Sequence, residues 1–324
     1  MADVMIFAET ADGAVTDLSL QCLNRAKALA GAQGGRVVAV LAGADVAGLA
    51  DGLVARGADQ VRVFESPALR PYLTAPYRRV VAGWIAAAKP ALALFPSSTI
   101  GDDLAPAVAA ELGAACVLDC DNAAFEGGAL KLTRTEFDRK VFAAYAGAAG
   151  ATVVATFKDS PIGAAEAQAG RSGEITRETP SADAPATALK VLRRDVAKKS
   201  VNLKDAKIIV AGGAGVGSAE GFALIKELAA ALNAEIGATR AVVDAGWLPA
   251  DHQIGQTGAT VRPDVYIACG ISGAVQHRVG MLDSRTIIAV NSDANAPIFK
   301  IAHYKLVGDL KAIVPKLVKL LKAG

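Results

Sequence analysis

The sequence lacks long apolar runs and a strong excess of either charge, and both absences exclude classes of protein. No run of about 18 apolar residues occurs, so we expect no transmembrane helix and no direct membrane insertion. Basic and acidic residues nearly balance, at 34 and 32, so no strong field attracts nucleic acid or an anionic membrane surface. We therefore expect no nucleic-acid partner.

Cysteines are few, and the four present form neither a CxxC pair nor a compact framework. Such spacing is typical of buried thiols in a reducing compartment, and it argues against a bound metal. The chain enters an apolar segment directly at Val4, with no basic leader and no Arg-rich presequence. The expected location is the cytoplasm of a bacterium.

Small and aliphatic residues dominate the composition. Hydrophobic residues make up 52% of the 324 positions, whereas aromatics make up only 5%. This balance is typical of parallel sheets covered by helices of small residues. Because single cores stop growing at about 250 to 300 residues, the length favours two domains.

Short apolar runs alternate with helical stretches through the first half, which predicts a parallel α/β sheet. The expected strands are Val4–Ala8, Arg36–Leu41, Gln60–Phe64 and Ala91–Pro96, and the expected helices are Leu18–Ala30, Val46–Ala55, Tyr77–Ala88 and Asp103–Leu112. Further runs, associated with a turn at Gly127-Gly128, predict antiparallel edge strands at Lys131–Phe137, Val141–Tyr145 and Thr152–Phe157. We expect an N-terminal mixed-sheet α/β domain.

A second α/β pattern follows a segment without apolar period at 158–185, which we interpret as the interdomain connection. The domains are expected at 1–190 and 205–324, with a linker at 191–204. The second should be a doubly wound parallel sheet. Its expected strands are Ile208–Val210, Ala241–Val243, Val265–Cys269 and Thr286–Val290, and its expected helices are Glu220–Leu232 and Asp309 to the end.

Glycine or polar clusters follow the strands of the second domain, at the edge where open α/β sheets bind ligands. Gly212-Gly-Ala-Gly-Val-Gly-Ser218 follows the first strand, and Gly270-Ile-Ser-Gly-Ala274 follows the third. Such turns present backbone N–H groups to a phosphate, but glycine also serves tight strand-to-helix turns, so both readings stay open. An ordinary NAD site fits less well, because Glu235 precedes the expected second strand and Asp244 comes late.

Three further features of the second domain suggest a site. The loop from Asp244 to Gly258 is long and dense in hydrogen-bonding residues, which favours function over a variable surface excursion. His277 is placed to lie one turn into a helix facing the same ligand, although a solvated histidine is equally consistent. Arg240 lies within the expected second strand and could serve the site or an ion pair. His252 and His303 have no partner pattern and are interpreted as structural.

Four motifs occur in one order: Gly237-Ala-Thr-Arg-Ala-Val-Val-Asp-Ala-Gly-Trp-Leu-Pro249, Gln253-Ile-Gly-Gln-Thr-Gly258, Gly270-Ile-Ser-Gly-Ala-Val-Gln-His277 and Ala296-Pro-Ile-Phe299. Together they resemble the alpha subunits of electron transfer flavoproteins, the FixB family. Gly101-Asp-Asp-Leu-Ala-Pro-Ala-Val-Ala109 extends the resemblance into the first half. It implies a heterodimer with a beta subunit, FAD in the C-terminal domain, and AMP or a second FAD in the beta subunit.

The resemblance also implies which residues hold FAD. Arg240, Thr239, Thr257 and His277 would lie by the flavin ring, the turn at 272–276 by the ribityl-pyrophosphate, and Asn291, Asp309 and Leu310 by the adenosine. The full expected set is Thr239, Arg240, Ile254, Gly255, Gln256, Thr257, Ser272, Gly273, Ala274, Val275, Gln276, His277, Asn291, Asp309 and Leu310. Ala214 departs from the family pattern, which commonly has arginine there, and Thr239 replaces the usual serine.

A redox carrier rather than an enzyme is the expected role. A flavin that holds one extra electron is stabilised by positive donors at its ring edge, and we expect Arg240 and His277 to be such donors. The resemblance implies acyl-CoA dehydrogenase-type donors, a quinone oxidoreductase acceptor and a place in fatty acid β-oxidation, with NADH-driven bifurcation also possible. The alternatives are an NAD-dependent oxidoreductase and an adenine-nucleotide-binding regulatory module.

Overall fold

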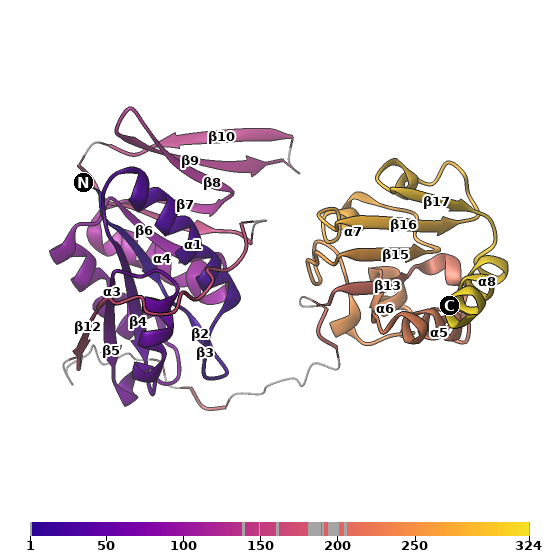
Figure 1. Ribbon diagram of the computed structural model, residues 1–324, viewed down its shortest axis with the longest axis horizontal. Helices are drawn as coiled ribbons and strands as arrows, with labels where there is room; N and C mark the ends of the chain where they lie inside the picture. The colour runs from indigo at the N-terminus through magenta and orange to yellow at the C-terminus, as the bar shows by residue number, and fades with distance from the viewer. Residues whose placement is uncertain are drawn as a thin grey trace. The chain divides into compact units, whose positions relative to one another are not determined.

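The computed structural model describes residues 2–137, 140–148, 150–159, 162–180, 189, 191–193, 201–203 and 206–323. The chain divides into two compact units, residues 1–194 and 195–324, each with a parallel sheet (Figure 1). The expectation of two α/β units is therefore confirmed. The linker expected at 191–204 falls mostly outside the described residues. No described helix is long and apolar enough to cross a bilayer.

Parallel strands form the central sheet of the N-terminal unit, in the order β12-β5-β4-β1-β6-β11-β7. Side chains alternate between two buried faces, so that Val4 and Ile6 pack on one side while Met5 and Phe7 pack on the other. The bounds are β1 Val4–Phe7, β4 Val37–Gly43, β5 Gln60–Glu65, β6 Leu92–Pro96, β7 Ala115–Cys120, β11 Val153–Phe157 and β12 Glu174–Glu178.

Helices cover both faces of this sheet, as its apolar strands require. On one face lie α1 (Asp17–Ala32) and α2 (Ala50–Ala55), and on the other lie α3 (Thr74–Ala88) and α4 (Thr99–Leu112). These helices match the expected ones closely. The short elements are β2 (Thr10–Ala11), β3 (Ala14–Val15), η1 (Ala47–Leu49) and η2 (Pro67–Leu69).

Antiparallel strands occur in this unit, but in a sheet of their own rather than in a mixed one. That sheet has the order β10-β9-β8, with β8 (Asn122–Glu126) and β9 (Ala129–Glu136) joined at Gly127-Gly128 and β10 (Val141–Ala146) at the edge. The expectation of an antiparallel strand at 152–157 is wrong. β11 lies between β6 and β7 and is parallel to both. All five of its residues are buried, as is typical of a central strand.

The segment interpreted as the interdomain connection also contains a strand. β12 (Glu174–Glu178) pairs in parallel with β5 at the sheet edge. Its sequence, Glu-Ile-Thr-Arg-Glu, is polar because an edge strand with little cover needs few apolar residues. The absence of an apolar period therefore did not mean an absence of structure.

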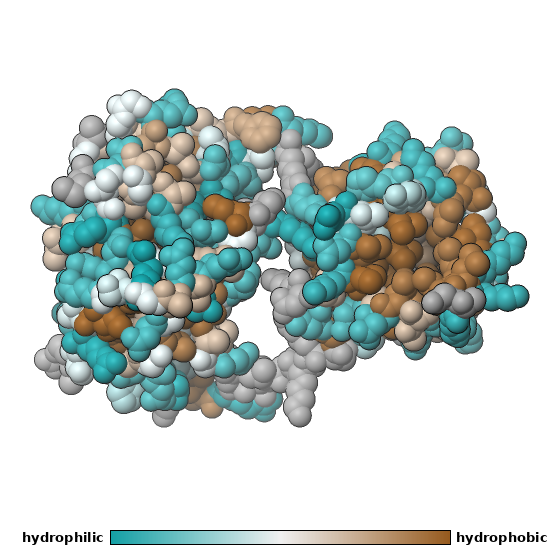
Figure 2. All heavy atoms as spheres, viewed as in Figure 1, coloured by the Kyte–Doolittle hydropathy of each residue, from teal (hydrophilic) through white to brown (hydrophobic). Residues whose placement is uncertain are grey.

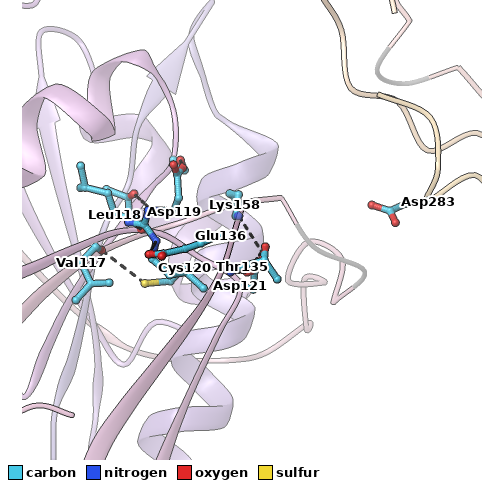
Figure 3. A network of polar contacts seen from close by, with 12 residues as sticks. Val117, Leu118, Asp119, Cys120, Asp121, Thr135, Glu136, Lys158 and Asp283 are labelled. Carbon is cyan, nitrogen blue, oxygen red and sulfur yellow. Dashed lines mark hydrogen bonds and ion pairs between the residues drawn. The ribbon is translucent and has the colours of Figure 1, made fainter. Parts of the chain in front are cut away.

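A polar network joins the antiparallel sheet to the parallel one (Figure 3). Asp121 accepts hydrogen bonds from the N–H and Oγ1 of Thr135, at 2.5 and 2.9 Å, and pairs with Lys158 Nζ at 3.2 Å. Burial raises the pKa of Asp121, but these donors outweigh it and hold that pKa below its usual value. Burial also raises the pKa of the Cys120 thiol, which donates to Val117 O, to about 12. The raised pKa disfavours the thiolate, which is the reactive form of a cysteine.

The C-terminal sheet is parallel throughout, in the order β14-β13-β15-β16-β17. α5 and α8 cover one face, and the loops after β14 and β15, with η5, cover the other. The bounds are β13 Ile208–Gly212, η3 Ala214–Val216, α5 Phe222–Leu232, β14 Glu235–Ala238, α6 Arg240–Asp244, η4 Ala250–His252, β15 Val265–Cys269, α7 Val275–Arg278, β16 Thr286–Asn291, η5 Pro297–Lys300, β17 Tyr304–Val307 and α8 Leu310–Ala323.

The strand expected at Ala241–Val243 is wrong, and its true position changes the geometry of the site. Those residues belong to α6, whereas the second strand is β14 at Glu235–Ala238. Gly237 lowers the strand propensity of this segment, so the sequence pattern missed the strand. A Cβ there would collide with Ile254, because it would lie 2.4 Å from Ile254 Cδ1. The glycine therefore makes room for the loop that packs over β14.

Candidate functional site

The strand order of the C-terminal sheet predicts where a ligand binds. Numbered from β13, the order is 2-1-3-4-5, the doubly wound arrangement in which the crevice lies between strands 1 and 3 at their carboxyl ends. A cavity of about 710 Å³ lies at this edge, a volume typical of cofactor sites. Figure 2 shows residues of high hydropathy gathered on the visible face of this unit.

Two glycine turns at this edge pack against each other, backbone to backbone. Gly213 N–H donates to Cys269 O at 3.0 Å, and Gly215 N–H donates to Gly270 O at 2.9 Å. A Cβ on Gly213 would lie 2.4 Å from Gly270 O, and Gly270 has a φ of +62°. The glycines are therefore required for this close approach, whether or not they also bind a phosphate.

The loop at 253–259 forms a wall of the cavity and is held from two sides. Ile254 N–H donates to Ala238 O at 2.9 Å, and Gln256 N–H donates to Gln276 O at 2.7 Å. Gly255 has a φ of +143°, and a Cβ there would lie 2.8 Å from Gln276 O. Through these two hydrogen bonds the loop is tied to β14 on one side and to α7 on the other.

His277 lies on α7 and lines the cavity, as its spacing from the Ser272 turn predicts. Its Nδ1 lies 3.0 Å from Ile254 O and its Nε2 lies 3.0 Å from the hydroxyl of Tyr266. Burial lowers the pKa of His277 to about 4, although the Ile254 carbonyl opposes this effect. In the chain without a ligand, this shift disfavours the charged ring, so the positive donor expected here stays a prediction for the FAD-bound site.

Arg240 also lines the cavity, but from the first turn of α6 and not from a strand. Its side chain is 69% exposed, and its Nε lies 3.2 Å from Asp244 Oδ2, an i,i+4 ion pair. The ion pair is therefore present, whereas a role of Arg240 toward a ligand stays a prediction. Because such an exposed pair is weak, the guanidinium remains available to a ligand.

Two threonines, Thr239 and Thr257, also line the cavity. Thr239 precedes α6, and its Oγ1 is buried and has no hydrogen-bond partner in the described structure. Because an unpaired buried hydroxyl is costly, this one is suited to form a hydrogen bond with a bound ligand. Thr257 lies at the exposed tip of the 253–259 loop, and its Oγ1 accepts from Gln253 Nε2 at 2.9 Å.

The residues expected at an adenosine end already have roles within the protein. Asn291 Nδ2 donates to Ile271 O at 2.9 Å, and its Oδ1 accepts from Asp293 N–H at 3.0 Å. Asp309 Oδ1 accepts from Lys311 N–H at 2.9 Å, at the start of α8. All of the expected site residues except Gly273 and Val275 line the cavity.

Some lining residues were not in the expected set. They share positions just after strand ends or in the neighbouring motifs, and they are Gly213, Ala214, Gly215, Ala241, Gln253, Gly270, Ile271, Ser292, Asp293, Ala296 and Pro297. Ser292 and Asp293 follow β16 directly, so the rule that polar residues at carboxyl strand ends mark the site would have found them.

Other expectations about single residues have mixed outcomes. His252 and His303 bond to backbone groups, at Ile236 O and Ile287 N, so their structural interpretation is confirmed. All four cysteines are free, but Cys116 is exposed and not buried as expected. No group of His, Cys, Asp or Glu suited to a metal occurs among the described residues.

The residues after β14 differ from those of an ordinary NAD site. Thr239 and Arg240 follow β14 at the position where an NAD fingerprint places an acid for the ribose hydroxyls. The unpaired Thr239 Oγ1 and the cavity volume of about 710 Å³ are consistent with a large ligand in contact with the loops. These features fit FAD.

Comparisons with known proteins match both units of the chain. The electron transfer flavoprotein FAD-binding domain matches residues 202–282, and the electron transfer flavoprotein domain matches residues 4–183. An electron transfer flavoprotein subunit alpha from Thermoanaerobacterium thermosaccharolyticum is 40% identical over 322 residues, 99% of this chain and 98% of that protein. The subunit alpha of Bacillus subtilis is 39% identical over 317 residues, 97% and 95% of the two chains. Protein FixB of Clostridium saccharobutylicum is 38% identical over 318 residues, again 97% and 95%.

Proposed function

Because this chain belongs to the electron transfer flavoprotein alpha-subunit family, we propose that its C-terminal cavity binds FAD and that the protein carries electrons between other proteins. The observation that carries this proposal is the gathering of the family motifs around one cavity at the carboxyl edge of a parallel sheet. Bound FAD would supply the one-electron chemistry, and the chain would supply its binding and electrostatics.

The geometry supports a placement of FAD along the cavity. Arg240, Thr239, His277 and the 254–257 wall would surround the flavin ring, which carries the transferred charge. The exposed turn at 272–276 would contact the ribityl-pyrophosphate through backbone N–H groups. Asn291, Asp309 and Leu310 would lie by the adenosine, close to the start of α8. Ala214 lines the cavity and lacks the guanidinium of the family pattern. At this position only backbone groups would contact the phosphates.

The partners follow from the family, and their identities are proposals. A beta subunit would complete the complex and hold AMP or a second FAD. The domains would be 1–190, pairing with that subunit, and 205–324, carrying FAD. Acyl-CoA dehydrogenases of fatty acid β-oxidation would donate electrons, and a quinone oxidoreductase would accept them. NADH-driven bifurcation is the alternative mode of action.

The edge of the antiparallel sheet is the surface that best suits the beta subunit. β10 has no strand on its outer side within the described structure, so it offers free backbone groups. Phe137 and Phe142 beside this edge are 73% and 77% exposed, and Val141 is 45% exposed. Exposed aromatics beside an unpaired strand are typical of a surface that another chain covers.

Replacing Phe142 with lysine is expected to weaken assembly with the beta subunit at least about tenfold, because a central aromatic contact is lost and a charge must be buried. Co-purification and a titration of the two subunits measure this. Ile162→Lys, an exposed apolar residue of the same unit outside that sheet, is the control. Equal affinity of the Phe142 variant and wild type would contradict this surface.

The electron-carrier proposal is tested on the two-subunit complex. With an acyl-CoA dehydrogenase and its substrate present, the visible flavin bands should bleach, and an added acceptor should restore them. Reduction by NADH instead of the dehydrogenase would indicate the bifurcating mode. A complex whose flavin is reduced neither by the dehydrogenase with its substrate nor by NADH would contradict the carrier role.

A further inference from the structure

The helix α8 packs against the C-terminal unit by one face only. Leu310, Val314 and Val318 are buried and belong to the core on that side of the sheet. They recur every four residues and so form one stripe along the helix, which lies beside α5 (Figure 1). The opposite face of α8 is exposed to solvent in the described structure.

The solvent face of α8 carries positive charge alone. The helix contains no acidic residue, and its exposed lysines are Lys311, Lys316, Lys319 and Lys322. Lys322 Nζ pairs with Glu227 Oε1 of α5 at 3.2 Å. The side chains of the other three lysines have no ion pair or hydrogen bond with any described residue. The whole chain nearly balances its charges, so this helix departs from the rest.

These charges do not help the helix to fold. Lys316, Lys319 and Lys322 follow one another at intervals of three, which places like charges on adjacent turns and destabilises the helix. Lys311 lies in the first turn, where the positive end of the helix dipole disfavours a cation. Among the four, Lys322 is the one that helix stability explains, because it lies in the last turn and pairs with Glu227.

An exposed leucine lies among these lysines. Leu320 is 70% exposed and follows Lys316 by four residues, so the two side chains share one face of the helix. The next residue, Leu321, is 44% exposed. Apolar side chains bordered by cations, without acids, are typical of helices that lie on a membrane surface.

The residue types on α8 favour a lipid surface over an acidic protein. Protein interfaces are enriched in arginine and aromatic residues and depleted in lysine, whereas α8 has lysines and neither of the others. Arginine matches a fixed carboxylate with a rigid fork, while lysine is a point charge on a flexible stem. Such a cation suits headgroups that have no fixed positions. Clusters of about four to eight basic residues are typical of contacts with anionic lipid.

We propose that the solvent face of α8 binds the surface of a bilayer that contains anionic phospholipids. Lys311, Lys316 and Lys319 contact the headgroups, and Leu320 enters the boundary between the headgroups and the acyl chains. The helix lies on the bilayer and does not cross it. This attachment involves neither the cavity nor FAD, so it goes beyond the proposed function and does not depend on it.

The test is flotation of the two-subunit complex, and of this chain alone, with two kinds of vesicle. One contains phosphatidylcholine only, and the other contains phosphatidylcholine and phosphatidylglycerol in equal parts. Wild type should bind only the second kind. Raising the salt from about 0.1 to about 1 M should release most of it, because the Debye length falls from about 10 to about 3 Å.

Variants of α8 locate the contact. Lys316→Gln combined with Lys319→Gln should weaken binding about 25-fold, because each lysine near an anionic surface contributes about fivefold. Leu320→Ala should weaken binding several-fold without changing its salt dependence, because no charge is removed. The control combines Lys207→Gln with Lys300→Gln, which removes the same charge from exposed residues of the same unit outside α8. It should leave binding almost unchanged.

The possible results separate the alternatives. Equal binding to both kinds of vesicle, or binding to neither, would overturn the proposal. Equal losses in the two double variants would also overturn it, because the effect would then come from net charge. A chain that binds polyglutamate but not the anionic vesicles would assign the face to an acidic protein instead. Binding by the chain alone and not by the complex would show that the beta subunit covers α8, against the proposal. A complex that takes up no FAD but still binds anionic vesicles would support this inference while the proposed function is lost.

Discussion

Replacing Gly273 with alanine is expected to abolish retention of FAD and to lower the free energy of unfolding by about 2 to 4 kcal/mol. Gly273 has a φ of +86°, and a Cβ there would lie 2.3 Å from the Ile298 backbone nitrogen. The neighbouring Ser272 O accepts from Ile298 N–H at 3.0 Å, so the 272–276 turn and η5 would have to separate. The turn proposed for the pyrophosphate would lose its shape.

A second glycine provides the matched control for this prediction. Gly217 has a nearly equal φ of +91°, but nothing lies within 4 Å of a Cβ placed there. Gly217→Ala therefore carries the backbone strain without the collision, at about 1 to 2 kcal/mol. Denaturant unfolding and the flavin content of the purified complexes separate the two effects. Equal losses in both variants would show that the approach to Ile298 does not matter.

Removing the charge of Arg240 is expected to lower the first one-electron potential of bound FAD by on the order of 100 mV. Burial lowers the pKa of His277 to about 4 and so disfavours its charged form, which leaves Arg240 as the main positive group among the expected ring-edge residues. A hydrogen bond to a charged group is worth roughly 1.5 to 3 kcal/mol, and about 59 mV corresponds to a tenfold change for one electron. Most FAD should remain bound to Arg240→Ala, because the glycine turns are unchanged.

Spectroelectrochemistry of the complex measures this shift. Arg285→Ala is the control, because Arg285 is also exposed, also pairs with an aspartate in the same unit, and does not line the cavity. Its removal should leave the potential almost unchanged. If both variants shift the potential equally, the effect comes from the general field of the protein and not from a contact at the flavin.

The helices and strands that were predicted correctly are those whose own hydrophobic pattern agrees with their burial in the fold. α1 and β4 have clear patterns, and both lie close to the expected residues. β14 was misplaced because its glycine serves a contact with a distant loop, which no local pattern reports. β12 was missed because an exposed edge strand needs no apolar run. Tertiary context decided both cases.

The cavity was easier to predict from sequence than the state of its side chains. Strand ends and motif order brought the right segments together, because parallel strands all end at one edge. The lowered pKa of His277 could not be predicted, since it depends on how deeply the folded chain buries the ring and on the Ile254 carbonyl beside it. Likewise, the capping role of Asp309 becomes visible only where α8 begins.

The most direct test of the central claim is the FAD content of the intact, gently purified two-subunit complex, set beside the same complex carrying Gly273→Ala. The account predicts a yellow wild-type complex with flavin bound to this chain and a variant that has lost that flavin. A wild-type complex that is colourless and does not take up added FAD would contradict it, as would a Gly273→Ala complex with unchanged flavin content.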